Sequence, residues 1–129
     1  MKKILILVIF SFIFMSYQTE GSIISVSVEE FESYIKDYGT TQLIDVRTPE
    51  EFEKGHIPGA KLVNIYATDF KEKISKLNLE KSKPVLIYCR SGNRSLVGGR
   101  YLAGRGYKVI NLKYGINDWI AKNKPIEKN

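Results

Sequence analysis

The chain has 129 residues, enough for one domain preceded by a short N-terminal segment. Its 20 Lys and Arg outnumber 14 Asp and Glu, giving a formal net charge of +6 at pH 7, but no basic stripe alternates with aromatic residues. This distribution argues against a nucleic-acid-binding protein, and a single cysteine excludes an internal disulfide.

Residues 1–21 are typical of a secretory signal peptide. Two lysines precede an uncharged stretch from Ile4 to Met15, which is shorter than the roughly 20 apolar residues of a membrane span. The Thr-Glu-Gly sequence that follows approximates a small-residue cleavage site, so we expect cleavage after Gly21. The protein is therefore expected to be exported, either periplasmic or secreted. The alternative is an uncleaved anchor formed by residues 4–17.

Predicted strands and helices alternate along the remaining segment, 22–129. Short apolar runs predict strands at 23–26, 42–46, 62–65, 84–88 and 108–112. Helical spacing of apolar residues and start and stop signals predict helices at 28–37, 49–54, 69–77, from the loop after residue 88 to about 105, and at 115–121. This alternation predicts a single α/β domain with a mainly parallel sheet of about five strands and helices on both faces.

Several helix boundaries carry recognisable signals. Ser27 and Glu30 have the spacing of a capping box, and Pro49 stands at a first helical position. Gly39 and Gly106 are suited to the left-handed conformation that ends a helix. Trp119 is expected to anchor the last helix in the core rather than to form a platform for a ligand.

The only cysteine, Cys89, follows the predicted strand 84–88 and opens a loop that leads into a helix. Ligands of parallel α/β sheets bind beyond the carboxyl ends of strands, where this thiol is expected. The loop contains Arg90, Ser91, Gly92, Asn93, Arg94 and Ser95. Nearby positive charge and a helix N-terminus both lower the pKa of a thiol, and the thiolate is the nucleophile. A lone cysteine is more often inert and buried, but this loop favours a reactive one.

Three segments resemble the single-domain rhodaneses, a family of sulfurtransferases. They are Leu43–Arg47 with Pro49–Phe52 and Gly55–Ala60, the loop Cys89–Ser95, and Val109–Trp119, and together they cover nearly all of residues 22–129. The third is less specific, because Tyr114-Gly115 stands where the family usually has two glycines. Gly98-Gly99 also replaces alanines common in the family, and each glycine inside a helix costs roughly 1 kcal/mol relative to alanine.

The resemblance implies a sulfurtransferase in which Cys89 alternates between thiolate and persulfide. A small anionic donor such as thiosulfate would give its outer sulfur to Cys89, and cyanide or another thiol, including a protein thiol, would remove it. No cofactor or nucleic acid is implied, and we expect a monomer. No metal is expected either, because no cluster of His, Cys, Asp and Glu has metal-ligand spacing.

The loop is suited to hold a negatively charged sulfur. Successive backbone N–H groups from Arg90 to Ser95 can form an anion-binding nest, for which Gly92 supplies the necessary backbone freedom. Arg90 and Arg94 favour an inorganic dianion such as thiosulfate over mercaptopyruvate. Arg94 has an alternative role, which is to cap the following helix or to form a salt bridge with it.

Three further residues are candidates for roles around the pocket. Asp45 and Arg47 follow a neighbouring strand, so both are predicted to support the site from behind the residues that touch substrate. For Arg47 we favour an ion pair with Glu51 that fixes the turn. His56, the only histidine, lies in a Gly-His-Ile-Pro-Gly turn, and the resemblance implies a structural role rather than that of a base.

Two other classes of function remain open. A non-enzymatic module could use the thiol of Cys89 for partner binding or redox sensing, because an exposed thiol of low pKa is readily oxidised. Phosphatases and arsenate reductases are less favoured. Related phosphatases place five residues between cysteine and arginine, whereas four separate Cys89 from Arg94.

Overall fold

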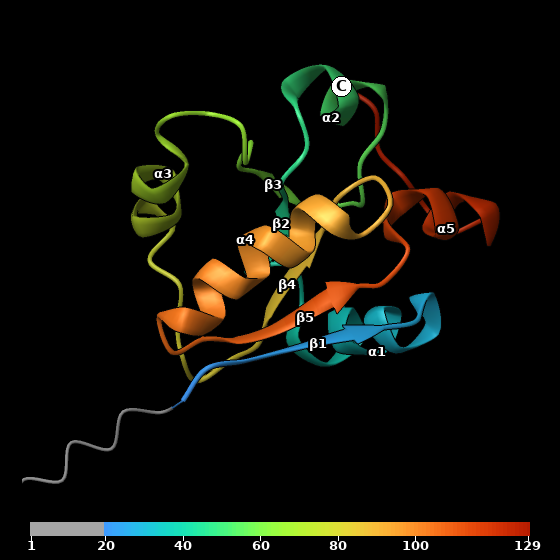
Figure 1. Ribbon diagram of the computed structural model, residues 1–129. Helices are drawn as coiled ribbons and strands as arrows, with labels where there is room; N and C mark the ends of the chain where they lie inside the picture. Colours follow the sequence, from blue (N-terminus) through green and yellow to red (C-terminus); the bar gives the residue numbers. More distant parts are fainter. Residues whose placement is uncertain (1–19) are drawn as a thin grey trace, which may run out of the picture.

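The computed structural model describes residues 20–129, so the predicted signal peptide lies almost wholly outside the described residues. Strands and helices alternate along the chain (Figure 1). The strands are β1 (Ser22–Val26), β2 (Leu43–Asp45), β3 (Lys61–Leu62), β4 (Val85–Tyr88) and β5 (Lys108–Leu112). The helices are α1 (Val28–Tyr38), α2 (Pro49–Lys54), α3 (Phe70–Lys76), α4 (Asn93–Gly104) and α5 (Gly115–Ala121). None of the helices in this described range is long and apolar enough to cross a membrane.

All five strands belong to one parallel sheet with the order β1-β5-β4-β2-β3. The predicted α/β class and five-stranded parallel sheet are confirmed. Strand β4 lies in the middle, and all four of its residues are buried. Because the strands are parallel, the loops after β2, β4 and β5 meet at one edge of the sheet. The cysteine loop therefore lies between two neighbouring strand ends.

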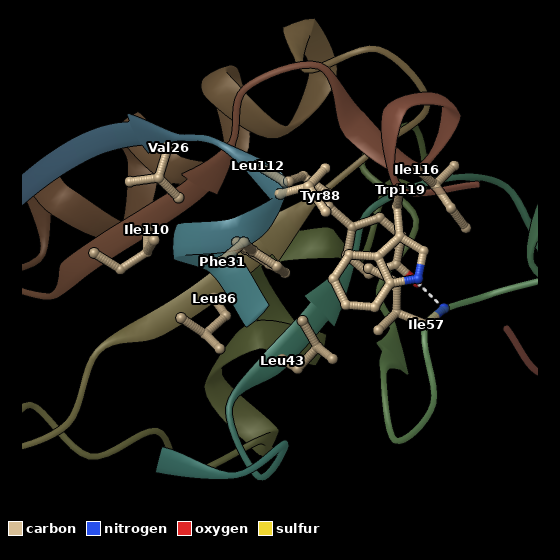
Figure 2. Packing of buried hydrophobic residues seen from close by; sticks show 11 residues of the cluster. Val26, Phe31, Leu43, Ile57, Leu86, Tyr88, Ile110, Leu112, Ile116 and Trp119 are labelled. Carbon is tan, nitrogen blue, oxygen red and sulfur yellow. Dashed lines mark hydrogen bonds between the residues drawn. The ribbon is translucent and has the colours of Figure 1, made fainter. Parts of the chain in front are cut away.

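Helices cover both faces of the sheet. On one face, α1 and α5 pack on the cluster that contains Phe31 and Trp119 (Figure 2). On the other, α3 and α4 contribute Phe70, Ile74 and Leu102 to a second cluster. The indole ring of Trp119 meets the ring of Phe31 edge-on, with 6.4 Å between the two ring centroids, as expected for a core residue.

Capping interactions set the starts of the two helices that follow β1 and β2. The side chain of Ser27 accepts a hydrogen bond from the backbone of Glu30, which is half of the predicted capping box. At α2 the box is complete, because Thr48 and Glu51 each accept from the backbone of the other. This double cap orients the side chain of Glu51, which matters at the site described below.

The predicted strand 62–65 is wrong in its bounds, because β3 consists of Lys61–Leu62 only. The carboxamide of Asn64 accepts a hydrogen bond from the backbone N–H of Tyr66 at 3.0 Å. This bond forms a turn just after the predicted strand, while the N–H groups of Val63 and Ile65 still donate to the backbone carbonyls of Asp45 and Val46. The apolar pattern alone did not reveal where regular strand pairing ends.

The glycine pair in α4 has a packing role. A Cβ atom at Gly98 would lie 3.3 Å from Ile87 of the sheet. A Cβ at Gly99 would overlap the side chain of Ile23 on β1. The two glycines therefore let the helix approach the sheet closely, which offsets the cost in helix propensity expected from the sequence.

Candidate active site

The sulfur of Cys89 lies directly after β4, beneath the loop that leads into α4. The residue is only 1% exposed, yet the surrounding donors are aimed at its sulfur. The backbone N–H of Gly92 lies 3.1 Å from Sγ, and the hydroxyl of Ser95 lies 3.3 Å from it. The Gly92 N–H is one member of the predicted nest of backbone donors, and the Ser95 hydroxyl is a second polar neighbour of the sulfur.

The loop lowers the pKa of the Cys89 thiol in spite of burial. Burial alone raises that pKa, because it disfavours the charged form. Hydrogen bonds from the Ser95 hydroxyl and from the backbone N–H groups of Ser95, Gly92 and Ser91 act in the opposite direction, and the net effect is a lowered pKa. The site thus favours a buried thiolate, the reactive form of cysteine.

Close packing against the β5–α5 connection fixes the shape of the loop. Gly92 and Gly115 both have positive φ angles, 106° and 67°. A Cβ at Gly92 would overlap the carbonyl of Lys113, and one at Gly115 would overlap the carbonyl of Arg90 and lie 2.6 Å from that of Cys89. Only glycine allows the two segments to approach this closely.

The start of α5 also binds the carbonyl groups of the loop. The N–H of Ile116 donates to the carbonyl of Cys89 at 2.9 Å, and that of Asn117 donates to the carbonyl of Arg90 at 3.1 Å. Because these two carbonyl groups of the loop face α5, the N–H groups of the loop can turn toward the sulfur of Cys89. Gly115, which makes this approach possible, is therefore a positioning residue of the site.

A chain of buried polar side chains continues behind Ser95. The hydroxyl oxygen of Ser95 lies 2.6 Å from Oδ1 of Asn111 on β5, and Nδ2 of Asn111 lies 3.1 Å from the hydroxyl of Ser25 on β1. Neither Asn111 nor Ser25 was predicted from the sequence to belong to the site. The available signal was a carboxamide inside an otherwise apolar predicted strand, since a buried polar group needs hydrogen-bonding partners.

Arg94 pairs with a carboxylate of α2. Its two terminal nitrogens lie 2.7 and 2.8 Å from the two carboxylate oxygens of Glu51, and its guanidinium lies over the ring of Tyr66. The hydrogen bond from Arg94 is the largest cause that lowers the pKa of Glu51 to about 2. The ion pair of Arg94 is therefore made with α2 and not with the helix that follows the loop, so the alternative predicted for Arg94 is wrong in its partner, while a direct role in binding substrate stays a prediction.

The expected ion pair between Arg47 and Glu51 is wrong. Arg47 forms a two-pronged bond to Asp45 instead, with the shortest distance 2.7 Å, and donates to the carbonyl of Gly55 at 2.7 Å. Arg47 can reach Asp45, only two positions earlier in the chain, because its side chain folds back over the end of β2. Glu51 is engaged by Arg94, a partner too distant in the sequence to be recognised there.

His56 is part of the scaffold. Its Nδ1 lies 3.0 Å from the carbonyl of Phe52, its ring stacks on the Phe52 ring, and its Nε2 lies 3.5 Å from a carboxylate oxygen of Glu127. The backbones of His56 and Glu127 also exchange two hydrogen bonds of 2.8 Å. These contacts attach the C-terminal segment to the end of α2, near the C label in Figure 1.

Two open depressions flank the loop. One, of about 350 Å³, is lined by Arg47, Glu51, Lys54, Gly55, Arg90, Ile116, Asn117 and Ile120. The other, of about 440 Å³, is lined by Ile65, Tyr66, Asn93, Arg94 and Val97. Of the two predicted supporting residues, Arg47 reaches the first depression, whereas Asp45 is fully buried behind it. Between Glu20 and Asn129, no group of three or more His, Cys, Asp or Glu residues could hold a metal ion.

Comparisons with known proteins agree with this fold. Residues 27–122 match the family of rhodanese-like domains. The chain is 34% identical over 110 residues to a putative sulfur carrier protein of Bacillus subtilis, covering 84% of this chain and 57% of that protein, so it spans little more than half of that relative. It is 35% identical over 99 residues to a sulfurtransferase of Allochromatium vinosum, covering 76% of this chain and 89% of the relative.

A solved structure shows the same fold. The crystal structure of a rhodanese-related protein from Thermoplasma volcanium superposes with a TM-score of 0.69 at 26% identity, covering 81% of this chain and 98% of that one. The cysteine loop at the end of the central strand, the five-stranded parallel sheet and these matches lead to one conclusion: the chain belongs to the rhodanese-like sulfurtransferase family.

Proposed function

We propose that this protein is a thiosulfate sulfurtransferase that carries the transferred sulfur as a persulfide on Cys89. One observation carries the proposal: the sulfur of the only cysteine of the chain receives a hydrogen bond from the Gly92 N–H and lies 3.3 Å from the hydroxyl oxygen of Ser95, at the start of α4. Donors aimed at a sulfur atom stabilise negative charge on it, both in the thiolate and in the terminal sulfur of a persulfide.

The proposed reaction has two steps. The Cys89 thiolate attacks the outer sulfur of thiosulfate, a sulfur–sulfur bond forms to Cys89, and the bond inside thiosulfate breaks with its electron pair leaving on sulfite. A nucleophilic acceptor, cyanide or a thiolate, then attacks the outer sulfur of the persulfide. It leaves as thiocyanate or as a new persulfide, and the Cys89 thiolate is regenerated. No proton acceptor is needed where Cys89 is already ionised.

The surroundings of Cys89 support an anionic donor. Arg90 is exposed, lines the depression of about 350 Å³ and forms no ion pair with another described residue. The hydrogen bond to Glu51 is the main cause that raises the pKa of the Arg94 guanidinium, and a negative charge on nearby Cys89 raises it further. We therefore propose thiosulfate rather than mercaptopyruvate as donor, and comparable turnover with mercaptopyruvate would contradict this preference.

Mass spectrometry of the intact protein tests the proposal. Incubation with thiosulfate should add one sulfur atom to the protein, and cyanide should then remove it as thiocyanate. The matched Cys89→Ser variant should gain nothing. If no sulfur is added at a saturating concentration of thiosulfate, the thiol serves another purpose, of which a binding or redox module is the main candidate. Turnover of phosphate esters would instead favour a phosphatase.

For residues 1–21 we propose a signal for export to the periplasm or the medium. The support is the basic start and apolar stretch of the sequence. Strand β1 begins at Ser22, so cleavage after Gly21 would leave every helix and strand described above intact.

A further inference from the structure

The hydroxyl of Ser95 has one proton and three acceptors within reach. Its oxygen lies 3.3 Å from Sγ of Cys89, 3.1 Å from the carbonyl of Gly92 and 2.6 Å from Oδ1 of Asn111. Ser95 and Asn111 are 0% and 1% exposed, so these contacts are sheltered from solvent. At any moment the proton can serve only one acceptor. Which one it serves decides whether the sulfur receives a hydrogen bond from Ser95.

The carboxamide of Asn111 can meet Ser95 in either of two orientations. With Oδ1 toward Ser95, it accepts the hydroxyl proton, and Nδ2 donates to Ser25 at 3.1 Å and points toward the carbonyl of Gly92 at 3.5 Å. With the amide turned over, Nδ2 donates to Ser95 and Oδ1 accepts from the hydroxyl of Ser25. Only the second orientation frees the Ser95 proton for Cys89.

The two orientations suit two charge states of the sulfur. A neutral thiol can donate its own proton to Ser95, whose hydroxyl then donates to Oδ1 of Asn111. A charged sulfur needs the Ser95 proton, and a hydroxyl that receives a hydrogen bond from Nδ2 donates more strongly in turn. The turned orientation brings Oδ1 near the carbonyl of Gly92, so it is favoured only when negative charge on Cys89 compensates for that contact.

We propose that Asn111 is a positioning residue whose carboxamide reverses as Cys89 becomes charged, turning the proton of Ser95 from Asn111 toward the sulfur. The reversal passes along the chain Ser25–Asn111–Ser95–Cys89, which joins strands β1 and β5 to the catalytic loop. If the function proposed above holds, the same reversal stabilises the terminal negative charge of the persulfide. The proposal for the thiolate itself does not depend on sulfur transfer.

The first test uses the unmodified protein and requires no sulfur donor. Nuclear magnetic resonance should show the side-chain amide signals of Asn111 changing with pH at the midpoint at which Cys89 ionises. That midpoint is taken from the thiolate absorbance of the protein minus that of Cys89→Ser. The carboxamide of Gln42 is the matched control, because it is also buried but donates to backbone carbonyls around residues 80–84. Its signals should not follow the ionisation of Cys89.

A double-mutant cycle separates the proposed reversal from simple charge repulsion. In the Asn111→Asp variant the ionised carboxylate can only accept the Ser95 proton and cannot donate to the hydroxyl. The ionisation midpoint of Cys89 should therefore rise by about one pH unit, so that at a pH below both midpoints the thiolate fraction is roughly tenfold smaller than in the unmodified protein. In a Ser95→Ala background most of this rise should disappear, because no proton is left to direct. The charged residues of the loop and of the neighbouring strand end, which are Arg90, Arg94 with its partner Glu51, and the Asp45–Arg47 pair, are unchanged throughout.

Two results would overturn the proposal. One is an Asn111 amide signal that does not follow the ionisation of Cys89, a measurement that remains decisive even if Asn111→Asp does not fold. The other is a rise that persists in full without Ser95, which would assign the effect to charge alone. Val109→Ala, a buried change on the same strand, controls for loss of stability and should leave the midpoint unchanged. Failure of thiosulfate to add sulfur to Cys89 would refute the proposed function. It would leave the inference about Asn111 untouched, because neither of these two measurements uses a sulfur donor.

Discussion

Replacing Gly115 by alanine should separate α5 from the cysteine loop. The added Cβ would overlap the carbonyl of Arg90 and lie 2.6 Å from that of Cys89, both of them backbone atoms that cannot move aside as a flexible side chain would. The hydrogen bonds from Ile116 to Cys89 and from Asn117 to Arg90 would lengthen or break. The loop would then lose the support that keeps its N–H groups turned toward the sulfur.

The loss of stability caused by Gly115→Ala can be estimated by comparison with the same substitution at a second glycine, Gly39. Gly39 also has a positive φ, 73°, but a Cβ there would have no atom within 4 Å. Gly39→Ala therefore measures backbone strain alone, about 1–3 kcal/mol. Gly115→Ala adds the loss of two buried hydrogen bonds at about 1 kcal/mol each. The free energy of unfolding should thus fall by about 2 kcal/mol more for Gly115→Ala than for Gly39→Ala.

Chemical denaturation of both variants gives the free energies, and the rate at which thiosulfate adds sulfur to Cys89 gives the functional effect. Gly115→Ala should slow this step about tenfold or more, since small displacements of reacting groups are costly. Gly39→Ala should leave the rate unchanged. Equal losses of stability in the two variants, together with a normal rate for Gly115→Ala, would refute the positioning role of Gly115.

Two further changes probe the framework of the site. Tyr88→Phe removes the hydroxyl that accepts a hydrogen bond from the buried Ile57 N–H at 3.0 Å, drawn as the dashed line in Figure 2. The free energy of unfolding, measured by chemical denaturation, should therefore fall by about 1–3 kcal/mol. An unchanged value would show that the Ile57 N–H finds another partner. Glu51→Gln removes the partner of Arg94. The pKa of Glu51 falls from 4.5 to about 2 on folding, so its pair stabilises the native state above the ordinary pKa and loses this effect as pH falls through about 2. After allowance for solvent screening, the Glu51→Gln variant should be about 1 kcal/mol less stable than the unmodified protein at neutral pH. This difference in the free energy of unfolding should vanish in acid. The control Glu50→Gln, at the exposed neighbouring position, should show no such loss of stability at either pH.

Much of the fold could be predicted because its signals are local. The runs 108–112 and 115–121 agree with β5 and α5 residue for residue, and the predicted position of Cys89 after the central strand is correct. Each of these depends on side-chain periodicity or on a terminating residue a few positions away. The strand predicted at 62–65 was wrong in its bounds, because the regular register with β2 ends at Leu62 even though Val63 and Ile65 still donate hydrogen bonds to Asp45 and Val46.

The sequence by itself determined that a thiol would follow a buried strand and enter a loop of small and cationic residues, since all of these features lie in one continuous segment. Only the tertiary structure decided the partners. Arg94 meets Glu51 across 43 positions, Ser95 meets Asn111 across 16, and Asn111 meets Ser25 across 86. Contacts of this kind depend on how the parallel strands are ordered in the sheet, and strand order leaves no mark on the residues near each partner.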